Sequence, residues 1–352
     1  MTCQTCDNNA PAMGERHPIL SVRDLTVRFA GVDQPILDRV SFDVGKGEVV
    51  ALVGESGSGK SVTALSIMRL LPPGATVSAT AIDFSGQDLL NLSASEFDHL
   101  RGGRLSMLFQ QPQAMLDPTS RVGVQVGEPL HYHNGIHGRE NRRQVVELLA
   151  EVGIPDPSAR ADCYSFELSG GMAQRVMMAA ALSASPELLI ADEPTTALDV
   201  TVQAQILRLL DAERRRRRLA VLLITHDLSV VSAVADRIIV MYAGRIVEEG
   251  PAARVLKQPS HPYTQALIRC SLFQTDAQGK LFSLPHGAVH ARDLTAGCRF
   301  HPRCPVAQAH GCLDHCVIEE PHLCETGTDC GCKARCWATS SEHHDVCEGV
   351  PV

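Results

Sequence analysis

One octapeptide constrains this chain more than any other feature. Residues 54–61 read Gly-Glu-Ser-Gly-Ser-Gly-Lys-Ser, and they stand between a short apolar run, Glu48–Val53, and a segment with helical periodicity, Val62–Leu70. A strand, a glycine-rich loop ending in Lys-Ser and a helix, in this order, are typical of a phosphate-binding loop. The glycines let backbone N–H groups turn toward phosphate, and the helix N-terminus adds a positive dipole end. We therefore expect an α/β chain that binds a nucleoside triphosphate.

Every residue of this phosphate loop is a candidate ligand of the nucleotide. Lys60 can reach the β- and γ-phosphates, and the Ser61 hydroxyl can bind Mg²⁺. The simpler alternative is a glycine- and serine-rich turn that contains a lysine by chance, and the strand and helix on either side argue against it. The predicted ATP-binding residues of the loop are Gly54, Glu55, Ser56, Gly57, Ser58, Gly59, Lys60 and Ser61.

A second apolar run, Leu188–Ala191, leads directly into Asp192 and Glu193. Ligands of parallel sheets sit at the carboxyl ends of the strands, so both acids are placed where a nucleotide would bind. Asp192 would complete the Mg²⁺ shell, and Glu193 would activate the attacking water as general base. Acids after a strand are often only helix caps, so this assignment depends on the phosphate loop. A third run, Ala220–Ile224, is followed by His226, which could contact the γ-phosphate, although a lone histidine there is more often structural.

Apolar runs alternate with helix-like segments, which predicts a mostly parallel sheet covered by helices on both faces. Residues 112–182 lack a clear strand and predict a helical insertion. We expect a flexible arm over residues 1–17, a nucleotide-binding domain over 18–255 and a C-terminal extension over 256–352. The strand-like segments are 19–29, 40–44, 48–53, 105–109, 188–191 and 220–225, and 238–247 predicts a hairpin.

Composition excludes several classes of function. Forty acidic against 32 basic residues give a formal net charge of −8, and aromatic residues make up 4% of the chain, which argues against a nucleic-acid partner. No apolar run approaches the roughly 18–20 residues of a membrane span. The first sixteen residues lack the apolar stretch of a signal peptide. We expect a protein kept in the cytoplasm that can dock onto a membrane partner.

The cysteines gather at the C-terminal end: of the thirteen in the chain, nine lie from Cys298 onward. In a reducing compartment such a cluster indicates metal ligands first and disulfides second. Apolar residues are few from about Pro285, so we expect this segment to need a metal to fold. The pair Cys3 and Cys6 supplies only two ligands and is a weak metal signal.

Taken together, these motifs resemble the ATPase subunit of ABC transporters, and the order and spacing fit from about Ile19 to Gly250. The Leu-Ser-Gly-Gly-Met element at residues 168–172 is diagnostic of that family among phosphate-loop proteins. The resemblance implies an ABC ATPase core with a mostly parallel sheet, an antiparallel β subdomain and a helical subdomain, followed by a small Cys-rich extension.

The resemblance also implies further site residues. In the family, a glutamine on a flexible loop connects the nucleotide site to the membrane partner and is also a ligand of Mg²⁺. Gln110 matches this glutamine. Phe29 stands where an aromatic ring stacks on adenine. The signature of one subunit closes over ATP bound to a partner subunit. The matching residues of that signature and of the loop across the interface are Ser169, Gly170, Gly171 and Asp199.

Residues 192–203, 261–267 and 297–305 narrow the resemblance to the importers for dipeptides, oligopeptides and nickel. This implies a subunit that hydrolyses ATP to power uptake of peptides, nickel or a related small solute. The implied partners are two membrane permease subunits, a second ABC ATPase that is a sister chain or a second copy, and, indirectly, an extracytoplasmic solute-binding protein. The implied location is the cytoplasmic face of the inner (plasma) membrane, as a peripheral subunit.

Two other functions remain open. A non-transport ABC ATPase of DNA repair or of the ribosome usually carries two cassettes, a long coiled coil or zinc insertions, whereas this chain has one cassette and no heptad run. An ATPase that senses metal or redox state would use the Cys-rich tail.

For the tail itself, the spacing of Cys298, Cys304 and Cys312 resembles that of this subfamily, with Cys336 matching the fourth position. Cys316 and Cys324 are the alternatives to Cys336 for this fourth position. Four thiolates suit a [4Fe–4S] cluster, which we expect, and they suit Zn²⁺ as the alternative.

Overall fold

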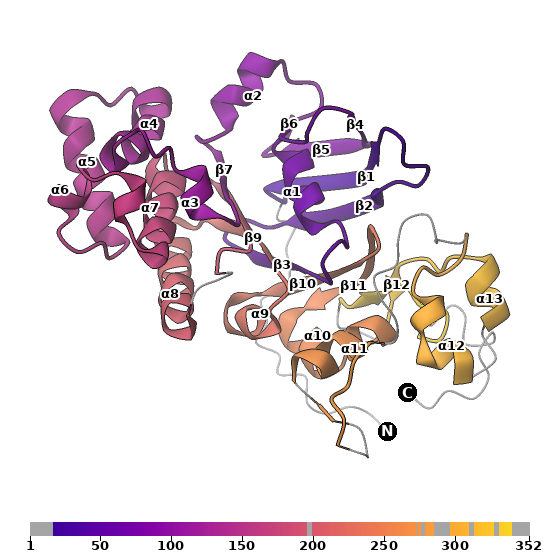
Figure 1. The fold of residues 1–352 in the computed structure, drawn as a ribbon. Helices are drawn as coiled ribbons and strands as arrows, with labels where there is room; N and C mark the ends of the chain where they lie inside the picture. The colour runs from indigo at the N-terminus through magenta and orange to yellow at the C-terminus, as the bar shows by residue number, and fades with distance from the viewer. Residues whose placement is uncertain are drawn as a thin grey trace.

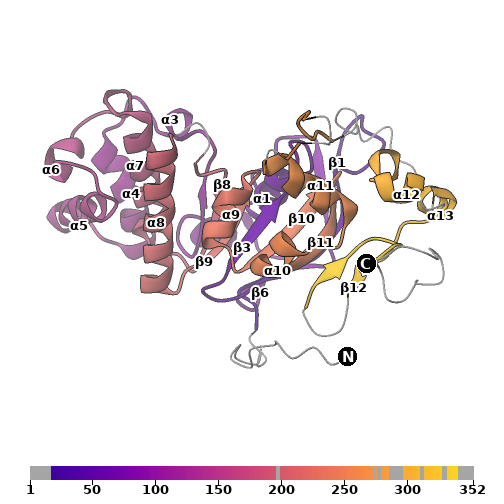
Figure 2. The same ribbon diagram turned by 90° about the horizontal axis from the view of Figure 1, so that it is seen from below.

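The computed structural model describes residues 17–195, 199–272, 274–275, 279–284, 296–309, 313–326 and 331–339. A large central sheet runs through the molecule, with a second sheet, a group of helices and the C-terminal extension arranged around it (Figures 1 and 2). The predicted N-terminal arm, apart from His17, lies outside the described residues, and so does Cys312.

The large sheet is the frame of the molecule. Its strands, from one edge to the other, run β12-β13-β11-β10-β3-β9-β8-β7, parallel from β10 to β7 and antiparallel from β12 to β10. Every residue of β3, β8 and β9 is buried, because elements cover both faces of these strands. The prediction of a mostly parallel sheet is confirmed. The bounds are β3 Val49–Val53, β7 Leu105–Leu108, β8 Leu188–Asp192, β9 Ala220–Thr225, β10 Arg237–Tyr242, β11 Arg245–Pro251, β12 Cys324–Glu325 and β13 Lys333–Ala334.

A smaller antiparallel sheet has the order β2-β1-β5-β6, with β4 paired to β1. Its apolar face packs with helix α1 (Lys60–Ile67) against one face of the large sheet, where Val50 and Leu52 of β3 point. Helix α2 (Ala94–Leu100) follows, begun by a capping box between Ser93 and Glu96. The bounds of the strands are β1 Leu20–Phe29, β2 Leu37–Val44, β4 Ala75–Ser78, β5 Ala81–Phe84 and β6 Gln87–Asp88.

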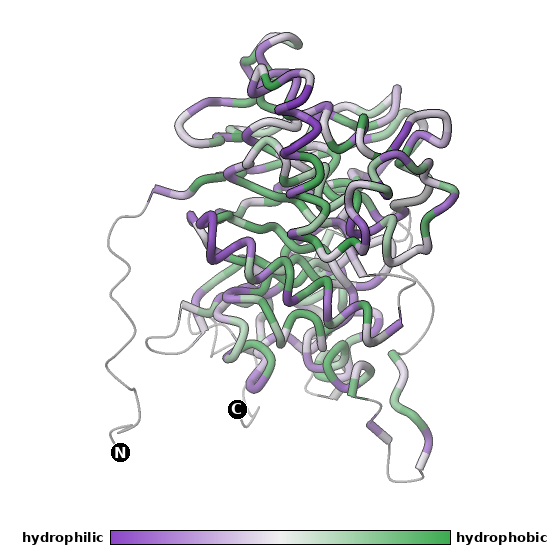
Figure 3. Tube along the Cα trace, turned by 90° about the vertical axis from the view of Figure 1, so that its left-hand side faces the viewer, coloured by the Kyte–Doolittle hydropathy of each residue, from purple (hydrophilic) through white to green (hydrophobic). Residues whose placement is uncertain are grey.

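The predicted helical insertion forms a helical group at one side of the large sheet (Figure 1). Its apolar side chains join those of α8 (Val200–Arg217) and of alternate residues on β8 and β9 in a second buried cluster. The hydropathy tube shows apolar residues concentrated inside the molecule and polar ones along its outer turns (Figure 3). The helices are α3 Pro112–Met115, α4 Val122–Asn134, α5 Gly138–Glu151, α6 Pro157–Arg160 and α7 Gly170–Ser183.

The extension folds onto the β10–β11 edge of the large sheet. Its strands β12 and β13 continue that sheet, and Tyr263, Phe300 and Trp337 are at most 3% exposed in a third apolar cluster. The extension therefore has an apolar core, because it shares the face formed by β10 and β11, which the sequence analysis did not foresee. Helices α9 (Leu228–Val234) and α10 (Ala252–Lys257) come before most of the extension and share this third cluster. The later helices are α11 Pro262–Ser271, α12 Pro305–Ala309 and α13 Leu313–Ile318.

Across the described helices, none is both long enough and apolar enough to span a membrane.

Candidate nucleotide site

The phosphate loop connects the end of β3 to the start of α1. Gly54 and Gly59 have φ angles of 155° and 104°, in the region that favours glycine. A Cβ at Gly54 would lie 2.2 Å from the carbonyl oxygen of Met241, and one at Gly59 would lie 2.5 Å from Cδ2 of Leu37. Both positions therefore require glycine. These two glycines let the backbone of the loop curve closely past the end of the sheet.

Lys60 is buried at the start of α1, and its ammonium group donates to the carbonyl oxygens of Gly54 at 2.8 Å and of Glu55 at 2.9 Å. Burial lowers the pKa of Lys60, although the negative charges of Glu193, Asp192 and Glu55 act in the opposite direction. Among the described residues, the hydrogen-bond acceptors of this buried cation are these two carbonyl oxygens, and it is suited to exchange one of them for a phosphate oxygen.

Ser58 gives an independent indication that an anion fits here. Its hydroxyl is buried, and it has no hydrogen-bond partner among the residues that the structure describes. Buried polar groups are nearly always bonded, so an unpartnered hydroxyl in this loop fits an acceptor such as a phosphate oxygen. The residues present therefore fit a bound triphosphate.

The oxygens of Ser61 and Asp192 form the second part of the site. The Ser61 hydroxyl donates to Asp192 Oδ1 at 3.1 Å, across 131 residues of sequence. Burial raises the pKa of Asp192, the bond from Ser61 lowers it, and the charge of Glu193 raises it. A carboxylate and a hydroxyl are the hard oxygen ligands that Mg²⁺ takes beside nucleotide phosphates, so this pair fits the ion.

Glu193 lies at the centre of the predicted catalytic residues. Its Oε2 accepts a hydrogen bond from Gln110 Nε2 at 2.7 Å, and its Oε1 lies 3.0 Å from Nδ1 of His226. The three side chains follow β7, β8 and β9, which are neighbours in the sheet. Glu193 has a φ of 47°, and its N–H donates to the carbonyl of Ile224, so its backbone is fixed in a conformation that few side chains adopt.

The residues that the family resemblance places against ATP bound by a partner subunit lie at two helix N-termini. Ser169 begins α7 and accepts a hydrogen bond from the N–H of Met172, and both Ser169 and Gly170 are exposed. A Cβ at Gly171 would lie 3.0 Å from Cγ1 of Val202. Asp199 is exposed and begins α8 in the same way, while residues 196–198 lie outside the described part of the chain.

Phe29, the predicted adenine contact, is the last residue of β1. It is half-buried and packs on the apolar cluster beneath the antiparallel sheet.

Two residues of the extension contact the phosphate loop, and the sequence analysis did not predict either contact. The hydroxyl of Tyr263 accepts a hydrogen bond from the N–H of Glu55 at 2.8 Å. Arg303 donates to both carboxylate oxygens of Glu55, at 2.9 and 3.1 Å. Both residues belong to segments that carried the family resemblance, but spacing alone does not reveal what such a segment touches.

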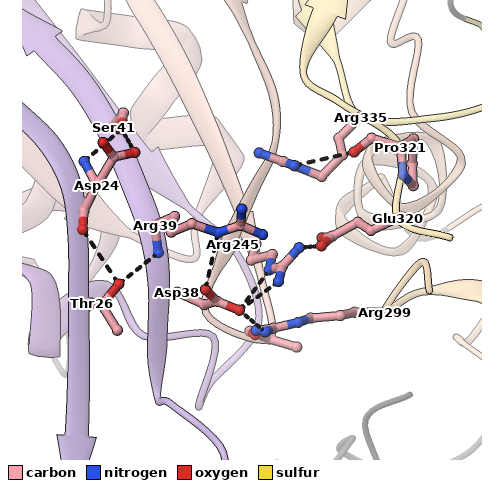
Figure 4. Close-up of polar contacts among 11 residues, drawn as sticks. Asp24, Thr26, Asp38, Arg39, Ser41, Arg245, Arg299, Glu320, Pro321 and Arg335 are labelled. Atoms are coloured by element: carbon pink, nitrogen blue, oxygen red, sulfur yellow. Dashed lines mark hydrogen bonds and ion pairs between the residues drawn. The ribbon is translucent and has the colours of Figure 1, made fainter. Parts of the chain in front are cut away.

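A group of arginines attaches the extension to the core (Figure 4). Asp38 accepts hydrogen bonds from Arg245 and Arg299, and Arg245 also pairs with Glu320. Arg335 donates to the carbonyls of Ile246 and Pro321. This arginine cluster, Arg245, Arg299 and Arg335, therefore holds three guanidinium groups around the two carboxylates of Asp38 and Glu320.

Neighbouring cysteines of the extension raise the pKa values of Cys298 and Cys316. Burial, followed by the charges of Cys316, Cys336 and Cys304, raises the pKa of Cys298 to about 12. Burial, followed by Cys304 and Cys336, raises that of Cys316 to about 11. Cys316, one of the two alternatives to Cys336 for the fourth position, is thus a neighbour of the predicted ligand cysteines. No three His, Cys, Asp or Glu side chains are arranged to hold a metal ion in the part of the chain that the structure describes.

Comparison with known proteins identifies the family. The family model "ABC transporter" matches residues 37–196, and the model for the C-terminal region of oligopeptide/dipeptide transporters matches residues 247–312. The dipeptide transport ATP-binding protein DppD of Escherichia coli is 46% identical over 307 residues, which are 87% of this chain and 92% of DppD. A putative peptide import ATP-binding protein of Brucella melitensis biotype 1 is 43% identical over 321 residues, 91% of this chain and 94% of that protein.

A solved structure supports the same conclusion. The ATP-binding cassette MJ0796, in a dimeric post-hydrolysis state bound to ADP and Pi, superposes with a TM-score of 0.59 at 27% identity, over 66% of this chain and 98% of that chain. The chain therefore belongs to the ABC transporter family, as an ATP-hydrolysing, ATP- and Mg²⁺-binding subunit of its oligopeptide/dipeptide group.

Proposed function

We propose that this chain hydrolyses ATP to drive the import of small peptides through membrane permease partners. The observation that carries the proposal is the convergence of Gln110 and His226 on the two oxygens of Glu193, beside the phosphate loop. The names of the relatives, dipeptide transport and peptide import ATP-binding proteins, support the cargo.

In this proposal, each side chain has one task in the hydrolysis. Lys60 binds the β- and γ-phosphates, and Phe29 stacks on the adenine. Ser61, Asp192 and Gln110 would hold Mg²⁺, which would supply positive charge to neutralise the phosphate oxygens. Glu193 takes a proton from the attacking water, and His226 contacts the γ-phosphate and orients that carboxylate.

The site is completed by another subunit. Ser169, Gly170 and Gly171 lie at an exposed helix N-terminus, where backbone N–H groups and the helix dipole favour an anion. We infer that they close over ATP held by a second ABC ATPase, with Asp199 at the same interface. That second subunit is a sister chain or another copy of this one.

The proposed partners follow from this role. ATP hydrolysis by this chain drives transport through two membrane permease subunits, and an extracytoplasmic solute-binding protein delivers the cargo to them. The chain would then be a peripheral subunit at the cytoplasmic face of the inner membrane. Within it, we assign residues 18–255 to the nucleotide-binding domain, with the helical subdomain at about 112–182, and residues 256–352 to the extension.

A growth assay tests the import function. Cells that obtain an essential amino acid only from an imported dipeptide should stop growing when this chain is deleted. The parent chain should restore growth and Glu193→Gln should not, while the free amino acid supports growth in all strains. Growth of the deletion strain on the dipeptide would contradict the proposal. If uptake of nickel falls instead, the ATPase role stands and the peptide cargo is wrong.

We also propose that Cys298, Cys304, Cys312 and Cys336 hold a metal centre, with iron–sulfur preferred over zinc; Cys312 lies outside the described residues. Cys304 and Cys336 both raise the pKa of Cys298, so these three thiols lie near one another, and soft sulfur donors fit either group. The nearby arginine cluster has more positive than negative charge, and the charge of Cys298 acts on both Arg245 and Arg335. A set of thiolate ligands would supply the negative charge that balances it.

Metal analysis tests this centre. Protein purified without oxygen should be brown and contain iron with acid-labile sulfide, and Cys298→Ser or Cys304→Ser should abolish the colour. Cys312→Ser should lose the metal and Cys316→Ser should keep it. Stoichiometric zinc in a colourless protein would identify a structural zinc site instead. If the purified protein contains no metal, the proposed metal centre is wrong.

A further inference from the structure

Glu55, the second residue of the phosphate loop, is held at three points. Its carbonyl oxygen accepts from Lys60, its N–H donates to the hydroxyl of Tyr263, and its carboxylate pairs with Arg303 through two hydrogen bonds. The last two contacts come from the extension and span 208 and 248 residues of sequence. The extension therefore touches the loop that receives the nucleotide.

The two side chains that make these contacts are themselves fixed. Tyr263 is 0% exposed, and its ring packs against those of Tyr242 and Phe300 at centroid distances of 4.6 and 5.4 Å. Arg303 is 6% exposed and donates to the hydroxyl of Tyr242 at 3.3 Å. An arginine guanidinium keeps its positive charge at any physiological pH. The guanidinium is thus a permanent positive charge on a rigid support.

We propose that the C-terminal extension positions the phosphate loop for ATP, with Arg303 and Tyr263 as positioning residues that act through Glu55. This inference rests on the proposed ATP site. A carboxylate in the phosphate loop repels the triphosphate unless a cation neutralises it, and Arg303 provides that cation. Tyr263 fixes the backbone next to the same carboxylate, so the N–H groups of the loop are oriented before the nucleotide arrives.

This role predicts an effect on affinity rather than on turnover. Arg303 and Tyr263 contact Glu55 and the ring of Tyr242, whereas Gln110 and His226 contact the carboxylate of Glu193 at the ends of β7 and β9. Loss of the Arg303 charge leaves the Glu55 carboxylate unneutralised in both the free and the ATP-bound site. ATP binding therefore weakens, while the rate at saturating ATP stays close to that of the parent.

The test measures the dissociation constant of Mg²⁺–ATP by calorimetry on the full chain, and kcat and KM on the assembled complex. Arg303→Gln should raise the dissociation constant about tenfold, as loss of one partner of a charge pair does, and should change kcat less than about twofold. The double variant Glu55→Gln with Arg303→Gln should bring the constant back to within about threefold of the parent, because the unpaired carboxylate is gone. Arg303→Lys should lie between the parent and Arg303→Gln.

Arg269→Gln is the matched control, because Arg269 is also an arginine of the extension, and it is exposed near the end of α11, where its guanidinium lies over the ring of Phe282. It should bind ATP like the parent. If Arg303→Gln is unstable, Tyr263→Phe serves instead, since it removes one hydroxyl and should weaken binding about threefold.

An unchanged dissociation constant in Arg303→Gln or in Tyr263→Phe overturns the proposal, and so does a double variant no better than Arg303→Gln alone. Lys60→Ala separates this failure from failure of the site itself. If Lys60→Ala binds ATP like the parent, the assigned ATP site is wrong. If only the Arg303 and Tyr263 variants bind normally, the site stands and the extension does not position it.

Discussion

Gln110 Nε2 lies 2.7 Å from Glu193 Oε2, so the end of β7 is joined directly to the end of β8 at the centre of the site. The opposite carboxylate oxygen faces His226. Any displacement of the loop that carries Gln110 therefore changes how the Glu193 carboxylate is held. We propose that the membrane partner acts on water activation through this bond.

Replacement of Lys60 by alanine should weaken Mg²⁺–ATP binding by about a hundredfold, because charged hydrogen bonds to phosphate are lost. The midpoint temperature of thermal unfolding should not fall, because burial already disfavours the charged form of Lys60 in the nucleotide-free protein. Calorimetric titration and thermal unfolding measure both quantities. Lys257→Ala, at an exposed position on α10, is the control. Unchanged affinity in Lys60→Ala would show that this lysine does not bind the nucleotide.

Replacement of Ser169 by arginine should abolish ATP turnover and leave ATP binding by the same chain within about twofold of the parent, because the signature acts on a partner's nucleotide. Ser93→Arg is the matched control, since Ser93 is also an exposed serine that begins a helix. That control should lose about 1 kcal/mol of stability and keep its ATPase rate. Equal loss of binding and turnover in Ser169→Arg would argue against an intersubunit site.

Asp38 should contribute to stability in a pH-dependent way. Burial opposes ionisation of its carboxyl, but the hydrogen bond from Arg245 and the charges of Arg245 and Arg299 dominate and hold its pKa below the ordinary value of 3.8. Its stabilising effect is therefore present above pH 3.8 and is lost as the pH falls through the lower folded-state pKa.

Asp38→Asn should lower the free energy of unfolding by about 3 kcal/mol near neutral pH, since it leaves buried arginines short of a partner. The difference from the parent should shrink below pH 3.8. Asp98→Asn, which breaks an exposed pair with Arg101, should have little effect. Denaturant titrations at several pH values provide the measurement. A difference that grows as the pH falls would contradict the assignment.

Part of this site could be predicted from the sequence because its signals are local. The strand–loop–helix around Lys60 and the acids after β8 are patterns of fewer than 25 residues, and strand ends in a parallel sheet meet at one edge. The convergence of Glu193, Gln110 and His226 depends on the strand order β7-β8-β9, which the structure gives and the sequence pattern did not.

The contacts of the extension could not be predicted in the same way. β12 and β13 have two residues each, too few for any periodicity, and they form only because β11 offers a partner edge. The pairing of Arg303 with Glu55 depends on how the extension packs, which no local pattern encodes.

The most direct test of the account is the Glu193→Gln variant, measured for ATP affinity and ATPase rate in the same assembled complex. The amide fits the site but cannot accept a proton from water, so binding should stay within about threefold of the parent while turnover falls at least about a hundredfold. Hydrolysis by Glu193→Gln at the parent rate would contradict the assignment of Glu193 as general base and the proposed mechanism that depends on it.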